Sequence, residues 1–221
     1  MSMKTQKKTL INWLGLLGLV SLISYAAAVI YTPSAYPGYD WKSQAVSDLS
    51  AVNAPSLQLW NQLNSLSVCG IICIMIACVA IQGKLNKTTR IGIYFFAAMF
   101  WFISIGYTIF PLSDSGYAGT FQDIMHLYVV TYFCAVFLSI VSLVLIMIGG
   151  FRKKSFVRLA VCATIALALM MVGAIGHGAA PAEYFGLFER FSPFAVFGFN
   201  AALGLFLFGG KFDGNSVLKR I

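Results

Sequence analysis

Long uncharged runs alternate with short charged segments along the whole chain. Charged residues are absent from residues 9–39, 49–83, 91–113, 124–151, 159–182 and 191–210. Each run can cross the hydrocarbon core of a membrane, which takes about 20 apolar residues in a helix. The pattern predicts an all-α polytopic membrane protein, a six-transmembrane-helix bundle with spans at about 10–31, 57–82, 91–111, 122–149, 157–178 and 191–210.

The composition leads to the same class and limits the function. Hydrophobic residues make up 59% of the chain and charged residues 10%, against about 45–50% and about 25% in an average soluble protein. The spans consume most of what we expect to be a single membrane domain over residues 1–221. Too little chain remains for a soluble catalytic domain or a receptor ectodomain, so any function must be built from the helices and their connections.

The distribution of charge predicts which side of the membrane each connection faces. Basic residues lie near the chain ends and in the connections at residues 83–90 and 151–158, and only Lys42 and Arg190 lie elsewhere. Positively charged segments stay in the cytoplasm, so we expect a multi-pass protein of the cell membrane with both termini cytoplasmic. All acidic residues except Asp213 then lie on the outer side. The net charge of +8 therefore reflects topology and indicates no nucleic-acid partner.

The outer connections carry the irregular sequence. The longest, residues 32–56, begins with prolines and glycine that predict turns, and the aliphatic spacing of its later part predicts a short interfacial helix. Asn61 and Asn64 follow one turn apart at the start of the second span. Amides in such positions usually hydrogen-bond to a neighbouring helix, and contact with a substrate or a metal ion is the alternative.

Small residues four positions apart predict two close helix contacts. Ala174 and Gly178 have this spacing in the fifth span, and Gly198 and Ala202 have it in the sixth. Small side chains let two helix backbones approach closely. The centres of the spans are otherwise almost featureless, which disfavours a transporter, because transporters place polar groups and broken helices near the mid-membrane.

Titratable groups concentrate at the outer end of the predicted bundle. His126 and His177 lie in the outer third of their spans, on the side that carries the acids. Ionisable groups at membrane depth are costly unless they pair, face water or bind a ligand. The outer end is therefore the candidate site, although a structural or interfacial role is the alternative for His177.

Asp123 and His126 are three residues apart and share one face of the fourth span. A carboxylate and an imidazole there could bind a divalent metal ion or transfer a proton. The alternative for Asp123 is structural, because Thr120 and Asp123 have the spacing of a capping box. A hydrogen bond within the bundle explains His126 equally well.

Two other charged residues also have alternative interpretations. Asp114 lies in a Ser-Asp-Ser-Gly sequence after the third span, which is typical of a turn. Arg190 follows Glu189 and opposes the charge bias of its side. We expect Arg190 to form a salt bridge with an outer acid, or to hold a lipid phosphate with its planar guanidinium.

Four short motifs together resemble a known family. They are Ser47-Asp48-Leu49 before the second span, Phe110-Pro111-x-x-Asp114 after the third, His126-Leu127 in the fourth and Gly186-Leu187-Phe188-Glu189-Arg190 before the sixth. Their order resembles an uncharacterised bacterial six-helix membrane family, domain of unknown function 998, over about residues 10–210. The resemblance implies six helices with the polar motifs at the outer end, and it implies no reaction.

These residues support three hypotheses of function. The first is a protein whose outer polar cluster binds a lipid headgroup, a small ligand or a partner. The second is a metal-assisted or acid-base hydrolase or transferase acting on lipid at the outer leaflet, and the third is a transporter. The catalytic candidates are Asp48, Asp114, His126 and Glu189. The ligand-binding candidates are Ser47, Asn61, Asn64, Asp123, His177 and Arg190. A divalent metal ion is the candidate cofactor, with His126, His177 and Asp114 as candidate ligands.

Overall fold

The computed structural model describes residues 8–212, apart from the side chain of His177, and Asp213 lies outside the described residues. The described chain is helical and contains no strand, which confirms the all-α prediction for it. The α-helices are α1 (Leu10–Leu14), α2 (Leu17–Tyr31), α3 (Leu57–Leu63), α4 (Cys69–Ala80), α5 (Lys87–Ile109), α6 (Phe121–Ile124), α7 (Leu138–Phe151), α8 (Val157–Ala179), α9 (Phe185–Glu189) and α10 (Phe191–Phe208). The remaining helical segments are the 3-10 helices η1 (Thr32–Ala35), η2 (Ser47–Ser50), η3 (Ser65–Val68), η5 (Lys154–Phe156) and η6 (Ala182–Tyr184), and the π-helix η4 (Met125–Phe137).

Five helical segments are long and apolar enough to cross a membrane. They are Leu10–Ala35, Lys87–Ile109, Phe121–Phe151, Lys154–Gly176 and Ala182–Phe208. A sixth span exists if Leu57–Leu63 and Ser65–Ala80, which meet at an angle of 44°, form one broken span. These helices are compatible with a multi-pass membrane protein, and the count of six stays a prediction.

The bend between α3 and η3 has a local cause in the sequence. It falls where polar residues interrupt the apolar run, and Ser65 Oγ donates a hydrogen bond to Gln62 O at 2.8 Å. Serine and asparagine side chains that bond to nearby backbone groups compete with the regular hydrogen bonds of a helix. Within residues 32–56, where an interfacial helix was predicted, the structure has only the short 3-10 helices η1 and η2.

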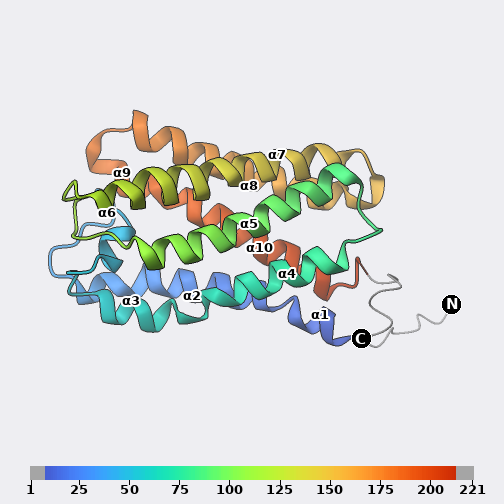
Figure 1. The fold of residues 1–221 in the computed structure, drawn as a ribbon, viewed down its shortest axis with the longest axis horizontal. Coiled ribbons are helices and arrows are strands. Elements are labelled where there is room, and N and C mark those ends of the chain that lie inside the picture. The colour runs from blue at the N-terminus through green and yellow to red at the C-terminus, as the bar shows by residue number, and fades with distance from the viewer. Residues whose placement is uncertain (1–7, 213–221) are drawn as a thin grey trace.

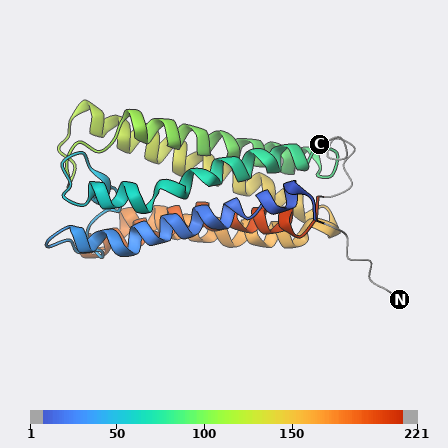
Figure 2. The same cartoon turned by 90° about the horizontal axis from the view of Figure 1, so that it is seen from below.

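The helices lie side by side and run along the long axis of the bundle (Figure 1). The short helices α3, α6 and α9 gather at one end, and the connections α4–α5 and α7–α8 lie at the other (Figures 1 and 2). We call the first the acidic end, because the acids of residues 32–56, 110–123 and 180–190 lie there, and the second the basic end. Both ends of the described chain reach the basic end, where Lys8 Nζ donates to Phe208 O at 3.0 Å.

Close backbone packing joins the first and last spans. Helix α10 packs against α2 and α8, while α5 packs against α7. A Cβ atom added to Gly15 or Gly204 would collide with the backbone oxygen of the other residue. Gly178 and Gly198, in contrast, have no atom within 4 Å of their Cβ positions. The close contacts predicted for these two glycines are therefore wrong, because residue spacing does not reveal which face of a helix is packed.

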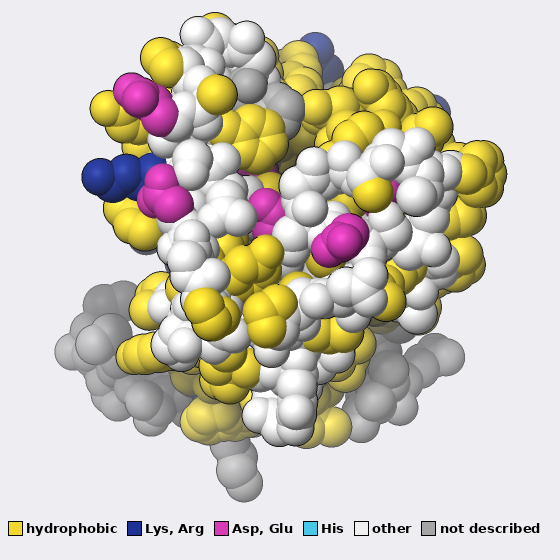
Figure 3. Space-filling model, turned by 90° about the vertical axis from the view of Figure 1, so that its left-hand side faces the viewer, with side chains coloured by type: hydrophobic (Ala, Val, Ile, Leu, Met, Phe, Trp, Pro, Cys, Tyr) yellow, Lys and Arg dark blue, Asp and Glu magenta, His cyan; other side chains and the backbone are white. Residues whose placement is uncertain are grey.

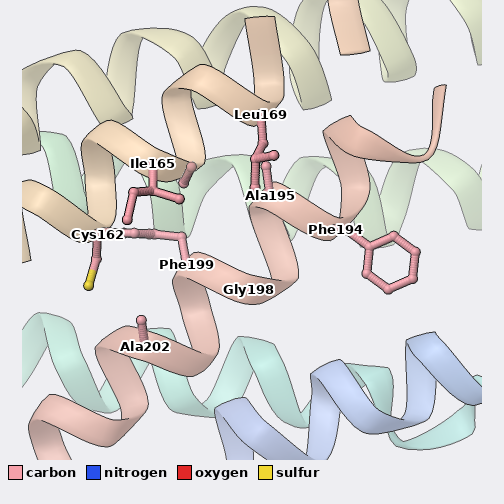
Figure 4. Close-up of a pocket in the computed structure, with 9 residues that line it drawn as sticks. Cys162, Ile165, Leu169, Phe194, Ala195, Gly198, Phe199 and Ala202 are labelled. Atoms are coloured by element: carbon pink, nitrogen blue, oxygen red, sulfur yellow. The ribbon is translucent and has the colours of Figure 1, made fainter. Parts of the chain in front are cut away.

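Gly198 instead lines a groove on the flank of the bundle. This groove has a volume of about 250 Å³ and lies between α8 and α10 (Figure 4). Its lining residues are Cys162, Ile165, Ala166, Leu169, Phe194, Ala195, Gly198, Phe199 and Ala202. A second groove of about 270 Å³ lies between α2 and the bend at α3 and η3. Apolar side chains dominate both linings, which suits surfaces that face lipid tails.

Candidate functional site

The acidic end is formed by two loops that meet over the ends of the helices. The first loop comprises residues 32–56 and the second comprises residues 110–120. Figure 3 looks onto this end, where acidic side chains are spread over the face and acidic atoms are visible in a hollow near its centre. The backbone of both loops is irregular, so its polar groups need partners other than helical neighbours. Side chains from the helix ends supply many of these partners.

Arg190 fastens the first loop to α9. The residue is 9% exposed, and Nη1 donates to Gly186 O and to Gln44 O at 3.1 Å. Nη2 donates to the hydroxyl of Tyr39 at 2.6 Å. All of these partners are neutral oxygens. The predicted salt bridge between Arg190 and an outer acid is therefore wrong. Sequence alone could not reveal partners that are mainly backbone carbonyls.

Tyr39 extends the same contact into the first loop. Its hydroxyl donates to Ala45 O at 2.8 Å while it accepts from Arg190. Burial raises the pKa of Tyr39 to about 12, although the positive charge of Arg190 lowers it. The phenol therefore stays protonated near neutral pH and keeps its donor role.

Glu189 also contacts the first loop. Its side chain is half-buried, and Oε2 accepts a hydrogen bond from Val46 N at 2.7 Å. This is the one hydrogen bond that Glu189 receives among the described residues. Glu189 is thus a half-buried acid with unused acceptor capacity.

Asp48 joins the two loops. It is buried, Oδ2 accepts from Ala45 N at 3.2 Å and Oδ1 accepts from Gly116 N at 3.0 Å. Burial raises the pKa of Asp48, while these hydrogen bonds and the nearby charges of Arg190 and His126 lower it. Asp48 is therefore electrostatically coupled to both residues, and its hydrogen bonds give it a structural role.

His126 is buried at the start of the π-helix η4. Nδ1 lies 2.9 Å from Phe110 O, and the ring lies against Tyr107 with centroids 5.0 Å apart. Thr131 Oγ1 donates to His126 O at 2.9 Å. A hydrogen bond within the bundle was one of the two expectations for this histidine, and the structure contains it. The π-helix is rare in proteins.

Asp123 caps the amino terminus of α6. Thr120 and Asp123 form the capping box that their spacing predicts, which confirms the structural alternative. The carboxylate also accepts from the backbone and the hydroxyl of Ser113, at 2.8 Å each. With these bonds, Asp123 has little acceptor capacity left for a ligand.

The other candidates do not join this group. Asp114 is exposed, and Oδ1 accepts from Ser115 N at 2.8 Å, as in the predicted turn. Ser47 is half-buried and Asn61 is exposed. Asn64 is half-buried, and its Oδ1 has no hydrogen-bond partner in the structure.

The described side chains include no group of three or more histidines, cysteines, aspartates or glutamates that could hold a metal ion. His177 was a candidate ligand, and its side chain lies outside the described residues. Among the other two candidates, His126 is buried against Phe110 and Asp114 is exposed in its turn. The proposed metal site therefore stays a prediction.

Two polar residues that sequence reasoning passed over are buried inside the bundle. Tyr25 is buried in α2, where its ring stacks on Phe197 with centroids 4.4 Å apart. Asn200 lies buried in α10, where Nδ2 donates to Gly70 O at 2.9 Å and Oδ1 has no partner. The span centres are thus less featureless than expected. The sequence signal that could have revealed these two residues is a single asparagine or tyrosine within an otherwise apolar run.

Comparison with known proteins identifies one relationship. A family model described as "Protein of unknown function (DUF998)" matches residues 19–205, a range that contains all four motifs of the resemblance. No curated protein and no solved structure matches the chain.

Proposed function

The chain belongs to the family described as "Protein of unknown function (DUF998)", and on this premise we propose that it is a multi-pass protein of the cell membrane that binds a lipid headgroup at its acidic end. The proposed topology has six spans and cytoplasmic termini, with the acidic end at the outer leaflet. Its support is the segregation of basic residues to the other end of the bundle.

The unused acceptor capacity of Glu189 is the observation that carries this proposal. A half-buried carboxylate near the membrane boundary is expensive unless it is paired or bound to something. Its neighbour Arg190 donates to carbonyl oxygens and to Tyr39 instead. Asp48 and Asp123, in contrast, have their acceptor atoms engaged by loop N–H groups. Glu189 is therefore the acid of this cluster with capacity for a ligand.

The experiment is lipid retention measured by native mass spectrometry of the purified protein. We expect bound lipid in the wild type and loss of most of it in Glu189→Gln. Glu183→Gln is the matched control, because Glu183 lies on the same end but is exposed. Equal lipid retention in wild type and Glu189→Gln, with both folded, would contradict the proposal.

A further inference from the structure

We propose that the basic end binds the headgroup of an anionic phospholipid between two of its connections, α4–α5 (residues 81–86) and α7–α8 (residues 152–156). This site lies at the other end of the bundle from Glu189 and does not depend on ligand binding there. Three observations lead to it. The two connections are held together, their positive charges have no acid nearby, and exposed apolar side chains beside these charges fit lipid tails.

Direct contacts fasten the two connections to each other. Asn86 Nδ2 donates to Gly149 O at 2.6 Å, and Lys153 Nζ donates to Lys84 O at 2.9 Å. A Cβ atom added to Gly149 would lie 2.6 Å from Thr89 N, so α5 and α7 approach each other closely here. The basic residues of this region therefore form one surface instead of two independent patches.

The positive charge of this surface has no acidic partner in the surrounding chain. Residues 84–90 contain three basic residues and residues 152–158 contain four, whereas residues 49–113 and 124–182 contain no acid. Two of these basic residues lie at the start of α5, where a positive charge opposes the helix dipole. Like charges held together repel each other, and a bound anion would relieve the repulsion.

Arg90 and Lys153 are the residues of this surface with the clearest capacity for an anion. Arg90 is half-buried, and its Nε is buried without a hydrogen-bond partner. A partly buried guanidinium that lacks an acceptor is costly, and an anion in contact with it offsets this cost. Lys153 Nζ is held in place by Lys84 O, which takes one of its three N–H donors. The other two donors can bind phosphate oxygens.

Exposed apolar side chains beside these charges favour a lipid over a soluble anion. Tyr94 lies one turn after Arg90 and is 40% exposed, and Phe151 at the end of α7 is 50% exposed. Val161, three residues after Arg158, is 43% exposed. Residues three or four apart share one face of a helix, so the acyl chains of a bound lipid would lie along these apolar flanks. A free phosphate would use the charges alone.

The test compares two lipids that differ in headgroup charge. The purified protein is presented with phosphatidylglycerol and with phosphatidylcholine of the same acyl chains, and retention is counted by native mass spectrometry. We expect the wild type to retain phosphatidylglycerol about 30-fold over phosphatidylcholine, because two basic residues at a membrane surface supply roughly this attraction. Raising the salt concentration should reduce the preference, since salt screens the charges. This salt titration tests the proposal without any variant.

Single substitutions locate the site. Arg90→Gln and Lys153→Gln should each lower the preference for phosphatidylglycerol about fivefold. Lys211→Gln is the matched control, because Lys211 is exposed at the same end but follows α10, outside the two connections. It removes an equal charge and should leave the preference unchanged. An equal loss in all three variants would indicate a diffuse attraction between lipid and positive charge and would overturn the site.

Further outcomes separate this site from a phosphate site and from the acidic end. A rise in unfolding temperature with inorganic phosphate that requires Arg90, without a preference between the lipids, would overturn the lipid headgroup as the ligand. Glu189→Gln should keep the preference for phosphatidylglycerol while it loses the lipid proposed for the acidic end. Equal retention of the two lipids by the wild type would overturn the site at the basic end and leave the proposal for Glu189 standing.

Discussion

Replacement of Arg190 by glutamine should release the first loop from α9 and leave the bundle folded. The guanidinium makes two hydrogen bonds to this loop, at 2.6 Å to the Tyr39 hydroxyl and at 3.1 Å to Gln44 O. A hydrogen bond to a charged group contributes about 1.5–3 kcal/mol. Glutamine can keep one weaker bond, so we expect a net loss of about 2–3 kcal/mol for docking of the loop.

Hydrogen exchange measures this loss directly. The amide of Val46 donates to Glu189 of α9 only while the loop is docked, whereas the amide of Ala45 donates to Asp48 of the same loop. Because each 1.4 kcal/mol is about tenfold, the exchange of Val46 should accelerate about 30- to 140-fold in Arg190→Gln, as measured in peptides covering residues 40–50.

The matched control is Lys42→Gln. Lys42 is the other basic residue at this end, and its side chain is exposed. Its replacement removes the same charge and should leave the exchange of Val46 unchanged. Unaltered exchange in Arg190→Gln, or equal acceleration in both variants, would refute the assignment of Arg190 as the anchor of the loop.

Two further predictions concern stability. Because burial raises the pKa of Asp48 above its usual 3.8, the protonated form is favoured in the fold, and the free energy of unfolding should fall as pH rises from about 3.8 through the raised pKa. Asp48→Asn should lose this dependence in thermal unfolding at a series of pH values, while Asp114→Asn, changed in an exposed turn, should keep it. Gly204→Ala should lower the free energy of unfolding by about 1–3 kcal/mol through overpacking, whereas Gly198→Ala has open space at its Cβ position and should change the melting temperature little.

Local features of this fold are predictable from sequence because their partners are close in the chain. The capping box of Thr120 and Asp123 is a contact across three residues, and the turn at Asp114 is shorter still. The segregation of charge to the two ends of the bundle is also predictable from sequence, because successive connections between spans lie at alternate ends. These features need no knowledge of which helices are neighbours.

Features that depend on tertiary neighbours are not predictable in this way. Arg190 reaches Gln44 across 146 residues and Tyr39 across 151. Its partners are mainly backbone carbonyls, which every residue has, so no residue type marks them. Likewise, Gly198 and Gly204 lie six residues apart on α10, yet only Gly204 meets another backbone. The face of a helix that is packed depends on the arrangement of the whole bundle.

The same distinction separates the structural polar residues of the acidic end from the candidate for ligand binding. Irregular backbone at the end of a bundle must have its polar groups satisfied, and this requirement accounts for most of the polar side chains there. Asp123 caps α6, Asp48 binds amides of both loops, and Arg190 binds carbonyls of the first loop and α9. Glu189 accepts one hydrogen bond from the described backbone, fewer than Asp48 or Asp123. Acidic residues at the end of a helix bundle therefore do not indicate a site by their type alone, and unused acceptor capacity is the more specific sign.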